Sequence, residues 1–175
     1  MNDGKFYSKN SLSFSSIESG CILPYKETQK VGKTNGGVVD NEGRYIDNSG
    51  LHEGHGCGYD FAKEDVVRIQ KSAIYLGMWF PIWGHCLTDN IKKLWFLQTE
   101  QAKALQQEGC DLVYIVMMNN KYTLTQSFID LLGSLGIKIQ DLKEIKEVTQ
   151  YEKIYIPDDS TFLCNDSINY TQTQT

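Results

Sequence analysis

The chain has 175 residues, of which 41% are hydrophobic and 22% charged, and its formal net charge is −5. This length suits one well-buried domain and is short for two. The composition is that of a soluble globular protein, and an apolar run near the roughly 20 residues that cross a bilayer does not occur. The acidic balance, without clusters of basic and aromatic residues, argues against nucleic-acid binding.

The first ten residues, MNDGKFYSKN, lack the apolar segment of a secretory signal. We therefore expect a cytoplasmic protein, with at most peripheral association at the inner face of the plasma membrane. The five cysteines are an odd number and form no C-x-x-C pair. This pattern predicts reduced thiols instead of a disulfide framework.

The amino-terminal third of the chain predicts little regular structure. Residues 1–20 are rich in Ser, Asn and Lys without lasting periodicity, which indicates a loose arm. Residues 36–46 place two β-prone runs around the turn sequence Asp40-Asn-Glu-Gly43, which favours a small β-hairpin. Residues 48–58 contain four glycines and predict a loop, because glycine is costly inside regular elements.

The middle of the chain predicts the longest elements. Residues 66–70 and 73–77 have the composition of two strands. From Gly84 onward apolar residues recur at helical spacing, and good helix formers continue to about Gln107, so we expect the longest helix there. Residues 112–118 are continuously apolar, which is typical of a strand buried on both faces of a parallel sheet.

A second helix follows, with Thr123 or Thr125 as its cap and Gly136 at its end. The remaining β-prone segments predict three strands, at residues 137–139, 145–148 and 153–156. Strands and helices that alternate with short links predict an α/β fold with a doubly wound sheet. Ligands of such sheets bind at the carboxyl ends of the strands.

The helix predicted from Gly84 has two chemically opposite faces at about 100° per residue. One face carries Leu87, Ile91, Leu94 and Trp95, and the other carries His85, Asp89, Lys92 and Phe96. His85 and Asp89 are therefore neighbours, and Asp89 can orient the imidazole and raise its basicity for catalysis. A polar pair at this spacing on a solvated helix face is equally a common structural feature.

Aromatic residues stand directly before this pair, at Tyr75, Trp79, Phe80 and Trp83. Such rings can bury the apolar faces of pyranoses while a few polar groups fix the hydroxyls, or they can simply pack a core. The candidate catalytic residues are His85 and Asp89. The candidate substrate-binding residues are Trp79, Trp83, Lys92, Lys93, His52 and His55.

His52 and His55 belong to the sequence His52-Glu-Gly-His-Gly-Cys57, which offers three potential metal ligands within six residues. The spacing does not place two histidines one helical turn apart, so it predicts a flexible loop near a substrate cleft instead of a zinc site. Asp158 and Asp159 follow a strand, where a metal or nucleotide could bind, but a turn explains them adequately. We expect no metal and no other cofactor.

Several separated motifs together resemble glycosyltransferase family 61. Its signature is similar to Tyr75-Leu-Gly77, Trp83-Gly-His85, Leu87, Asp89 and Leu94-Trp95. Its bacterial capsular-polysaccharide members are similar to Gly36-Gly-Val-Val-Asp40, Asn41-Glu-Gly43 and Tyr59-Asp-Phe61. The resemblance covers roughly residues 20–160.

The resemblance implies the amino-terminal, acceptor-side lobe of a two-lobed, GT-B-like enzyme. A Rossmann-like sheet would occupy residues 21–160, after the arm of residues 1–20, and residues 161–175 would be the truncated start of an interlobe segment. Such enzymes transfer a sugar from a nucleotide sugar to a glycan acceptor without an essential metal, here in capsular or exopolysaccharide biosynthesis. His85 and Asp89 would face the interlobe cleft, and either could be the base.

The chain departs from the family pattern in two ways. Lys92-Lys93 stands where relatives commonly have Ser-Arg, and these 175 residues contain no second lobe. One interpretation is a transferase that works with a separate carboxyl-terminal lobe or as a homodimer, and is inactive alone. The other is a truncated, catalytically inactive acceptor-binding or interaction module.

Overall fold

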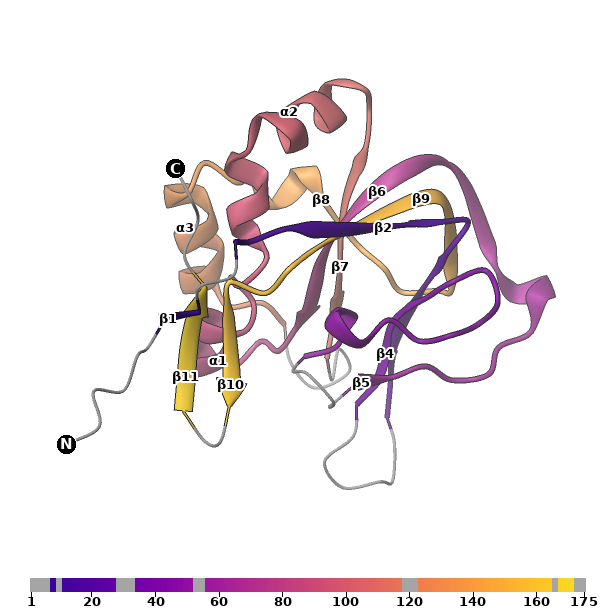
Figure 1. Cartoon of the computed structure of the whole chain (residues 1–175), viewed down its shortest axis with the longest axis horizontal. Coiled ribbons are helices and arrows are strands. Elements are labelled where there is room, and N and C mark those ends of the chain that lie inside the picture. Colours follow the sequence, from indigo (N-terminus) through magenta and orange to yellow (C-terminus); the bar gives the residue numbers. More distant parts are fainter. Residues whose placement is uncertain are drawn as a thin grey trace.

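The computed structural model describes residues 7–8, 11–27, 34–51, 56–117, 123–164 and 167–171. They form a mixed α/β fold with one eight-stranded sheet and one three-stranded sheet (Figure 1). The α/β class agrees with the alternation of predicted elements. Within the described ranges no helix is long and apolar enough to cross a membrane.

Four parallel strands form the centre of the larger sheet. They are β6 (Val67–Trp79), β7 (Asp111–Val116), β8 (Leu142–Glu144) and β9 (Thr149–Pro157), in the order β9-β6-β7-β8. All six residues of β7 are buried, which confirms the prediction from its continuous apolar run. β6 is one continuous strand where two were expected.

Antiparallel strands extend the sheet beyond β9. They are β2 (Phe14–Glu18), β3 (Cys21–Lys26) and β4 (Thr34–Val39), and β4 pairs in parallel with the short β5 (Gly56–Cys57). The first half of β9 pairs with β3 and the second half with β2. The arm expected over residues 1–20 therefore differs from the structure, because β2 satisfies its backbone on β9.

A small second sheet brings the two ends of the described chain together. It contains β1 (Tyr7–Ser8), β10 (Thr161–Cys164) and β11 (Ser167–Thr171) in the order β1-β11-β10. Figure 1 shows it beside α1, at the left of the molecule. The segment expected to begin a further unit thus forms strands that pair with the start of the chain.

The α-helices follow β6 and β7, and two of the 3-10 turns precede β6. They are α1 (Trp83–Thr88), α2 (Glu100–Gln107) and α3 (Gln126–Ser134), with the single turns η1 (Asp47–Ser49), η2 (Lys63–Asp65), η3 (Leu94–Gln98) and η4 (Ile139–Asp141). Thr125 accepts a hydrogen bond from the backbone of Phe128 at 3.3 Å, which confirms one of the two predicted caps. Gly136 follows α3 with φ of 78°, as expected of a residue that ends a helix.

The two faces of the sheet are covered differently. Leu105 of α2 and Phe128 of α3 both pack with Tyr114 of β7. On the opposite face Val113 packs with Ile22 of β3, beside β4 and the end of η1. The described helices thus share one face, unlike the predicted doubly wound arrangement, because β6, β7 and β8 advance in one direction and right-handed crossovers then fall on the same side.

The helix predicted from Gly84 to Gln107 is interrupted. α1 ends at Thr88, a turn follows, and α2 begins only after Thr99, whose hydroxyl accepts a hydrogen bond from Ala102 N at 3.2 Å. Asn90 stabilises the interruption, since its side chain accepts from Phe80 N at 2.8 Å and donates to Phe80 O at 3.1 Å. The helical phase is lost there, and Lys92 beyond it is buried. Leu87, before the interruption, is exposed, so both residues lie opposite to the predicted faces.

Of three smaller predictions, one is confirmed and two are wrong. The turn after Val39 forms as expected, with Gly43 N donating to Asp40 O at 3.0 Å and a bridge from Val39 to Tyr45. The strands expected at residues 137–139 and 145–148 are absent from the described chain, and β8 lies between them. The segment that pairs with the free edge of β7 is Leu142–Glu144, so neither predicted segment occupies that edge.

Candidate functional site

The carboxyl ends of β6 and β9 mark a reversal in the order of the sheet. The chain moves from β6 to β7 and β8 on one side, and then returns to add β9 on the other side of β6. Ligands of open parallel sheets bind at the carboxyl ends of the strands beside such a reversal. Here β6 leads into α1 and β9 leads into Asp158, Asp159 and Ser160.

His85 and Asp89 form a close pair at this edge. His85 Nδ1 lies 2.6 Å from Asp89 Oδ2, and Thr88 Oγ1 donates to the same oxygen at 3.1 Å. The Asp89 side chain is 9% exposed, whereas the His85 side chain is 36% exposed. A carboxylate only accepts, so the hydrogen in this contact is carried by His85 Nδ1.

Local backbone geometry sets this pair. Asp89 caps the carboxyl end of α1, and its backbone N–H donates to His85 O at 2.8 Å. One full helical turn therefore separates the two side chains even though the helix ends at Thr88. The predicted proximity of His85 and Asp89 is confirmed.

Exposed apolar side chains lie close to His85 in the chain. The rings of Phe80 and His85 lie 4.7 Å apart. Trp83 is 47% exposed, and Ile82 and Leu87 on either side of it are similarly exposed. Large apolar side chains usually avoid water, so their exposure beside a His–Asp pair distinguishes this edge from an ordinary solvated helix. Trp83 stands where the sequence predicts a substrate wall.

Trp79 has a different position. It is fully buried, its ring stacks on Tyr114 at 4.2 Å and meets the edge of Phe128 at 5.4 Å. Its indole N–H donates to Leu76 O at 3.1 Å. Trp79 therefore packs the core beneath the site and offers no surface to a ligand, which corrects its assignment as a substrate-binding residue.

Lys92 and Lys93 point into the protein. Lys92 Nζ lies 2.7 Å from Asp159 Oδ2, and Lys93 Nζ lies 2.7 Å from Asp159 Oδ1. The two lysine side chains are 3% and 0% exposed, and that of Asp159 is 17% exposed. We refer to these three residues as the lysine–aspartate cluster. Burial corrects the expectation that the lysines contact substrate.

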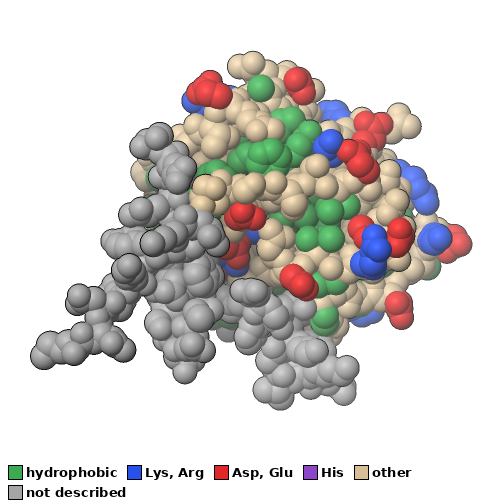
Figure 2. Space-filling model, viewed as in Figure 1, with side chains coloured by type: hydrophobic (Ala, Val, Ile, Leu, Met, Phe, Trp, Pro, Cys, Tyr) green, Lys and Arg blue, Asp and Glu red, His purple; other side chains and the backbone are tan. Residues whose placement is uncertain are grey.

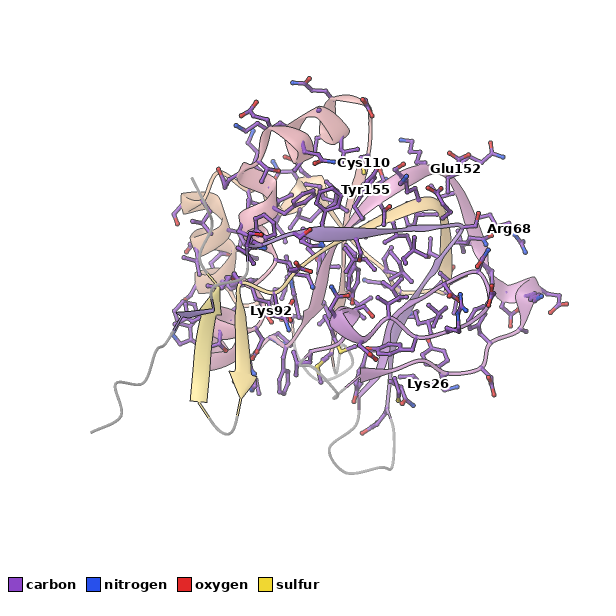
Figure 3. The ribbon with its side chains drawn as sticks, viewed as in Figure 1. Lys26, Arg68, Lys92, Cys110, Glu152 and Tyr155 are labelled. Atoms are coloured by element: carbon purple, nitrogen blue, oxygen red, sulfur yellow. The ribbon has the colours of Figure 1, made fainter. Side chains whose placement is uncertain are left out.

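The lysine–aspartate cluster joins three parts of the site. Lys92 Nζ also donates to the carbonyl of Leu51, and Lys93 Nζ donates to Pro157 O at 2.5 Å. Ser160 N donates to Lys92 O at 2.8 Å. Figure 3 shows Lys92 at the junction between β9 and β10. These bonds connect the turn after α1 to the end of β9 and to the segment at Leu51.

The charges of this cluster do not balance, because two ammonium groups share one carboxylate. Burial lowers the pKa of Lys93, and neighbouring Lys92 lowers it further, whereas Asp159 raises it. A glycine of β6 lies beside this cluster. Gly77 has φ of 108°. A Cβ added to Gly77 would lie 3.6 Å from Cδ of the Lys93 side chain.

The remaining candidates cannot all be placed. His52 and His55 lie outside the described residues, directly after Leu51. The segment before them is anchored to β6, because Tyr75 Oη donates to Ser49 O at 2.8 Å. Among the described side chains no three His, Cys, Asp or Glu residues gather as metal ligands. Among the described residues, Cys21, Cys57, Cys86 and Cys110 are not joined in disulfides.

Sequence reasoning missed two residues of this edge. Asn90 is fully buried and holds the start of α1 to the end of β6. Asp159 supplies the buried carboxylate, although its sequence was explained as a turn. The signal for Asp159 was its position, since an acidic residue directly after a parallel strand lies at the ligand-binding edge.

Comparison with known proteins gives no relative for this site. No family model, curated protein or solved structure matches the chain. We therefore infer the chemistry of the site from the geometry of its own residues.

Proposed function

We propose that this chain is the acceptor-side lobe of a glycosyltransferase that extends a bacterial capsular or exopolysaccharide glycan. One observation carries the proposal. The imidazole of His85, partly exposed at the carboxyl edge of β6, is held by the buried carboxylate of Asp89 at 2.6 Å. This is the arrangement of a general base with its orienting group. The order β8-β7-β6-β9 suits a Rossmann-like lobe, and the motifs that resemble glycosyltransferase family 61 include the same two residues.

The proposed step is sugar transfer with inversion. The imidazole of His85 takes the proton of an acceptor hydroxyl as that oxygen forms a bond to the anomeric carbon of a nucleotide sugar. The bond from the anomeric carbon to the phosphate oxygen breaks, and the nucleoside diphosphate leaves with the electron pair. Asp89 stabilises the imidazolium that forms, because its carboxylate lies against Nδ1–H.

Trp83 supports a carbohydrate as the acceptor. An exposed indole can bury the apolar face of a pyranose ring, and neighbouring polar groups then orient the hydroxyls. The lysine–aspartate cluster has a positioning role in this proposal, since its buried lysines tie the turn after α1 to β9. The cluster keeps the His85–Asp89 pair at the edge of the sheet.

Glycan binding is the first test. The labelled chain is applied to an array of bacterial polysaccharide fragments, and we expect it to bind a subset of them. Trp83→Ala should weaken this binding by about tenfold or more, because the stacking surface is lost. Leu135→Ala is the matched control, since Leu135 is an exposed apolar residue on the distant end of α3. An array without any bound glycan would contradict the acceptor-side assignment.

Transfer is the second test. Extracts of cells that express the chain from its own locus are supplied with the bound glycan and a mixture of nucleotide sugars, and products are followed by mass spectrometry. Asp89→Asn should lower the rate by about 10²-fold while glycan binding is kept. Equal rates for Asp89→Asn and the native chain would show that the His85–Asp89 pair has a structural role. Binding without any transfer would favour the alternative of an inactive acceptor-binding module.

A further inference from the structure

A second cleft lies at the opposite end of the sheet from His85. Its volume is about 370 Å³, and it opens where β6 and β9 begin, so its lining includes Arg68 and Gln150. Figure 3 shows Arg68 at the right of the molecule, well apart from Lys92, which lies left of the centre. Small-molecule sites commonly start at about 300 Å³, so the cleft has the size of a ligand site. Neither the His85–Asp89 pair nor the lysine–aspartate cluster belongs to it.

Five separate segments converge on this cleft and are held in place by hydrogen bonds. The turn at Asp40 is fixed because its carboxylate accepts from the backbone of Glu42 and of Arg44, each at 2.9 Å. Tyr59 Oη donates to Pro24 O at 3.0 Å. Walls that are already ordered lose little conformational entropy when a ligand binds.

Ser19, on the rim of the cleft, has φ of 53°, and it is a non-glycine residue in the left-handed region. Its N–H donates to Glu152 O at 2.8 Å, and its carbonyl accepts from Gln150 Nε2 at 3.0 Å. Strained backbone of this kind concentrates at binding sites, where the surrounding structure maintains it. The strain is an observation independent of the volume of the cleft.

The charges in the cleft select the class of ligand. Asp40, Glu42 and Asp60 line the cleft with Lys63 and Arg68, and Arg44 pairs with Asp40 and Glu42, so the charges balance and no net positive charge favours a phosphate. Charged walls also disfavour a purely apolar ligand. In the described part of the chain Asp60, Lys63 and Arg68 make no ion pair, and Arg68 Nη2 donates to Lys63 O at 3.3 Å. Their polar groups can therefore serve a ligand.

Phe61 adds an apolar surface to this polar cleft. It is half-buried and packs against the cluster formed by Cys21, Leu23 and Val39. Tyr59 is also half-buried, but Lys26 Nζ already lies 5.2 Å from the centre of its ring. Phe61 is thus the ring available for stacking. An aromatic ring among carboxylates, amides and a guanidinium suits a neutral polyhydroxylated ring, which has apolar faces and hydroxyl edges.

We infer that this cleft binds a neutral pyranose, as a second carbohydrate site remote from His85. Phe61 stacks on the sugar ring, and Arg68, Asp60 and Asn41 bind its hydroxyls. The inference does not depend on transfer at the His85–Asp89 pair. Figure 2 shows acidic and basic side chains side by side at the right of the molecule, the end where Arg68 lies in Figure 3.

The test is a ¹H–¹⁵N NMR titration of the chain with methyl glycosides of glucose, galactose, mannose and N-acetylglucosamine, and separately with inorganic phosphate. At least one glycoside should shift the amides of Asn41, Phe61 and Arg68. Phe61→Ala and Arg68→Met should each weaken that binding by about tenfold or more. Val67→Ala, an exposed neighbour of Arg68, should leave it unchanged. Arg68 is exposed, so Arg68→Met decides the matter even if Phe61→Ala fails to fold.

Trp83→Ala separates this site from the proposed acceptor site, because it should remove shifts at α1 and leave those at the cleft. The inference is overturned if no glycoside shifts the cleft amides, or if phosphate shifts them more than every glycoside. It is also overturned if Arg68→Met binds as tightly as Val67→Ala.

Discussion

Lys93 Nζ lies 2.7 Å from Asp159 Oδ1, while Lys92 Nζ lies 2.7 Å from the other oxygen of the same carboxylate. One carboxylate therefore serves two buried ammonium groups. Water cannot replace a lost partner inside the protein, so each charge depends on the others. The stability of the protein should accordingly depend more on the negative member of the lysine–aspartate cluster than on either positive member.

Asp159→Asn should lower the free energy of unfolding by about 3 kcal/mol, because it leaves two buried ammonium groups without a counter-charge. Urea denaturation followed by tryptophan fluorescence measures the change. Asp158→Asn is the comparison, since the half-buried carboxylate of Asp158 accepts a hydrogen bond from Ser13 N at 2.9 Å and lies next to Asp159 in the chain. Equal losses for the two variants would show that the cluster does not depend on Asp159.

Lys93→Met should change the free energy of unfolding much less, by about 1 kcal/mol or below, and an increase is compatible with the same argument. The substitution keeps most of the side-chain volume and leaves one ammonium group for one carboxylate. The same denaturation experiment measures it. A loss as large as that of Asp159→Asn would mean that the bond from Lys93 to Pro157 O outweighs the charge imbalance.

Local patterns sufficed for the elements whose environment is uniform. The run from Asp111 to Val116 is buried on both faces, so composition alone identified β7. The cap at Thr125 and the pair of His85 and Asp89 also depend on neighbours within one helical turn. These features needed no knowledge of distant contacts.

Distant contacts decided what the sequence could not predict. Lysines are almost always exposed, so helical periodicity placed Lys92 on a solvated face, whereas Asp159 draws it inward from the end of β9. Asn90 ends the helix by bonding to Phe80, and this bond depends on how α1 meets β6. The same packing decides which aromatic rings face solvent. The sequence alone therefore could not distinguish the buried Trp79 from the exposed Trp83.

Gly77→Ala should destabilise the fold by about 1–2 kcal/mol, because φ of 108° is unfavourable for a residue with a Cβ. The Cβ itself has room, since its nearest neighbour would be Lys93 Cδ at 3.6 Å. Gly84→Ala is the matched control. Gly84 lies in α1 with nothing within 4 Å of an added Cβ, so this variant should be neutral or slightly stabilising. Thermal unfolding of both variants checks the difference, and equal melting temperatures would contradict it.

Trp79→Ala and Trp83→Ala should affect different properties. Trp79 is fully buried between Tyr114 and Phe128, so its removal should cost about 3–5 kcal/mol of stability. Trp83 is 47% exposed, so its removal should change stability by about 0.5 kcal/mol or less. Denaturation curves compare the two. A large loss of stability for Trp83→Ala would show that Trp83 is part of the core and would weaken the proposed sugar-binding surface.

Alkaline pH should destabilise the protein through its buried tyrosines. Burial, aided by the nearby charge of Glu144, raises the pKa of Tyr114 to about 12, whereas an unfolded tyrosine titrates near 10.0. A phenol with a raised pKa binds its proton more tightly in the folded state. Its contribution is therefore fully present below pH 10 and is lost as the pH rises toward 12, by up to about 1.4 kcal/mol per pH unit for one group.

Tyr114→Phe isolates this contribution, because phenylalanine can keep the stack on Trp79 and cannot ionise. Free energies of unfolding at pH 9, 10 and 11 should fall less steeply for the variant than for the native chain. Absorbance near 295 nm reports phenolate formation in the same samples, and ionisation of Tyr114 should accompany unfolding. Because only the slope above pH 10 tests the argument, an equal slope in the two proteins would contradict it even if Tyr114→Phe altered stability at neutral pH.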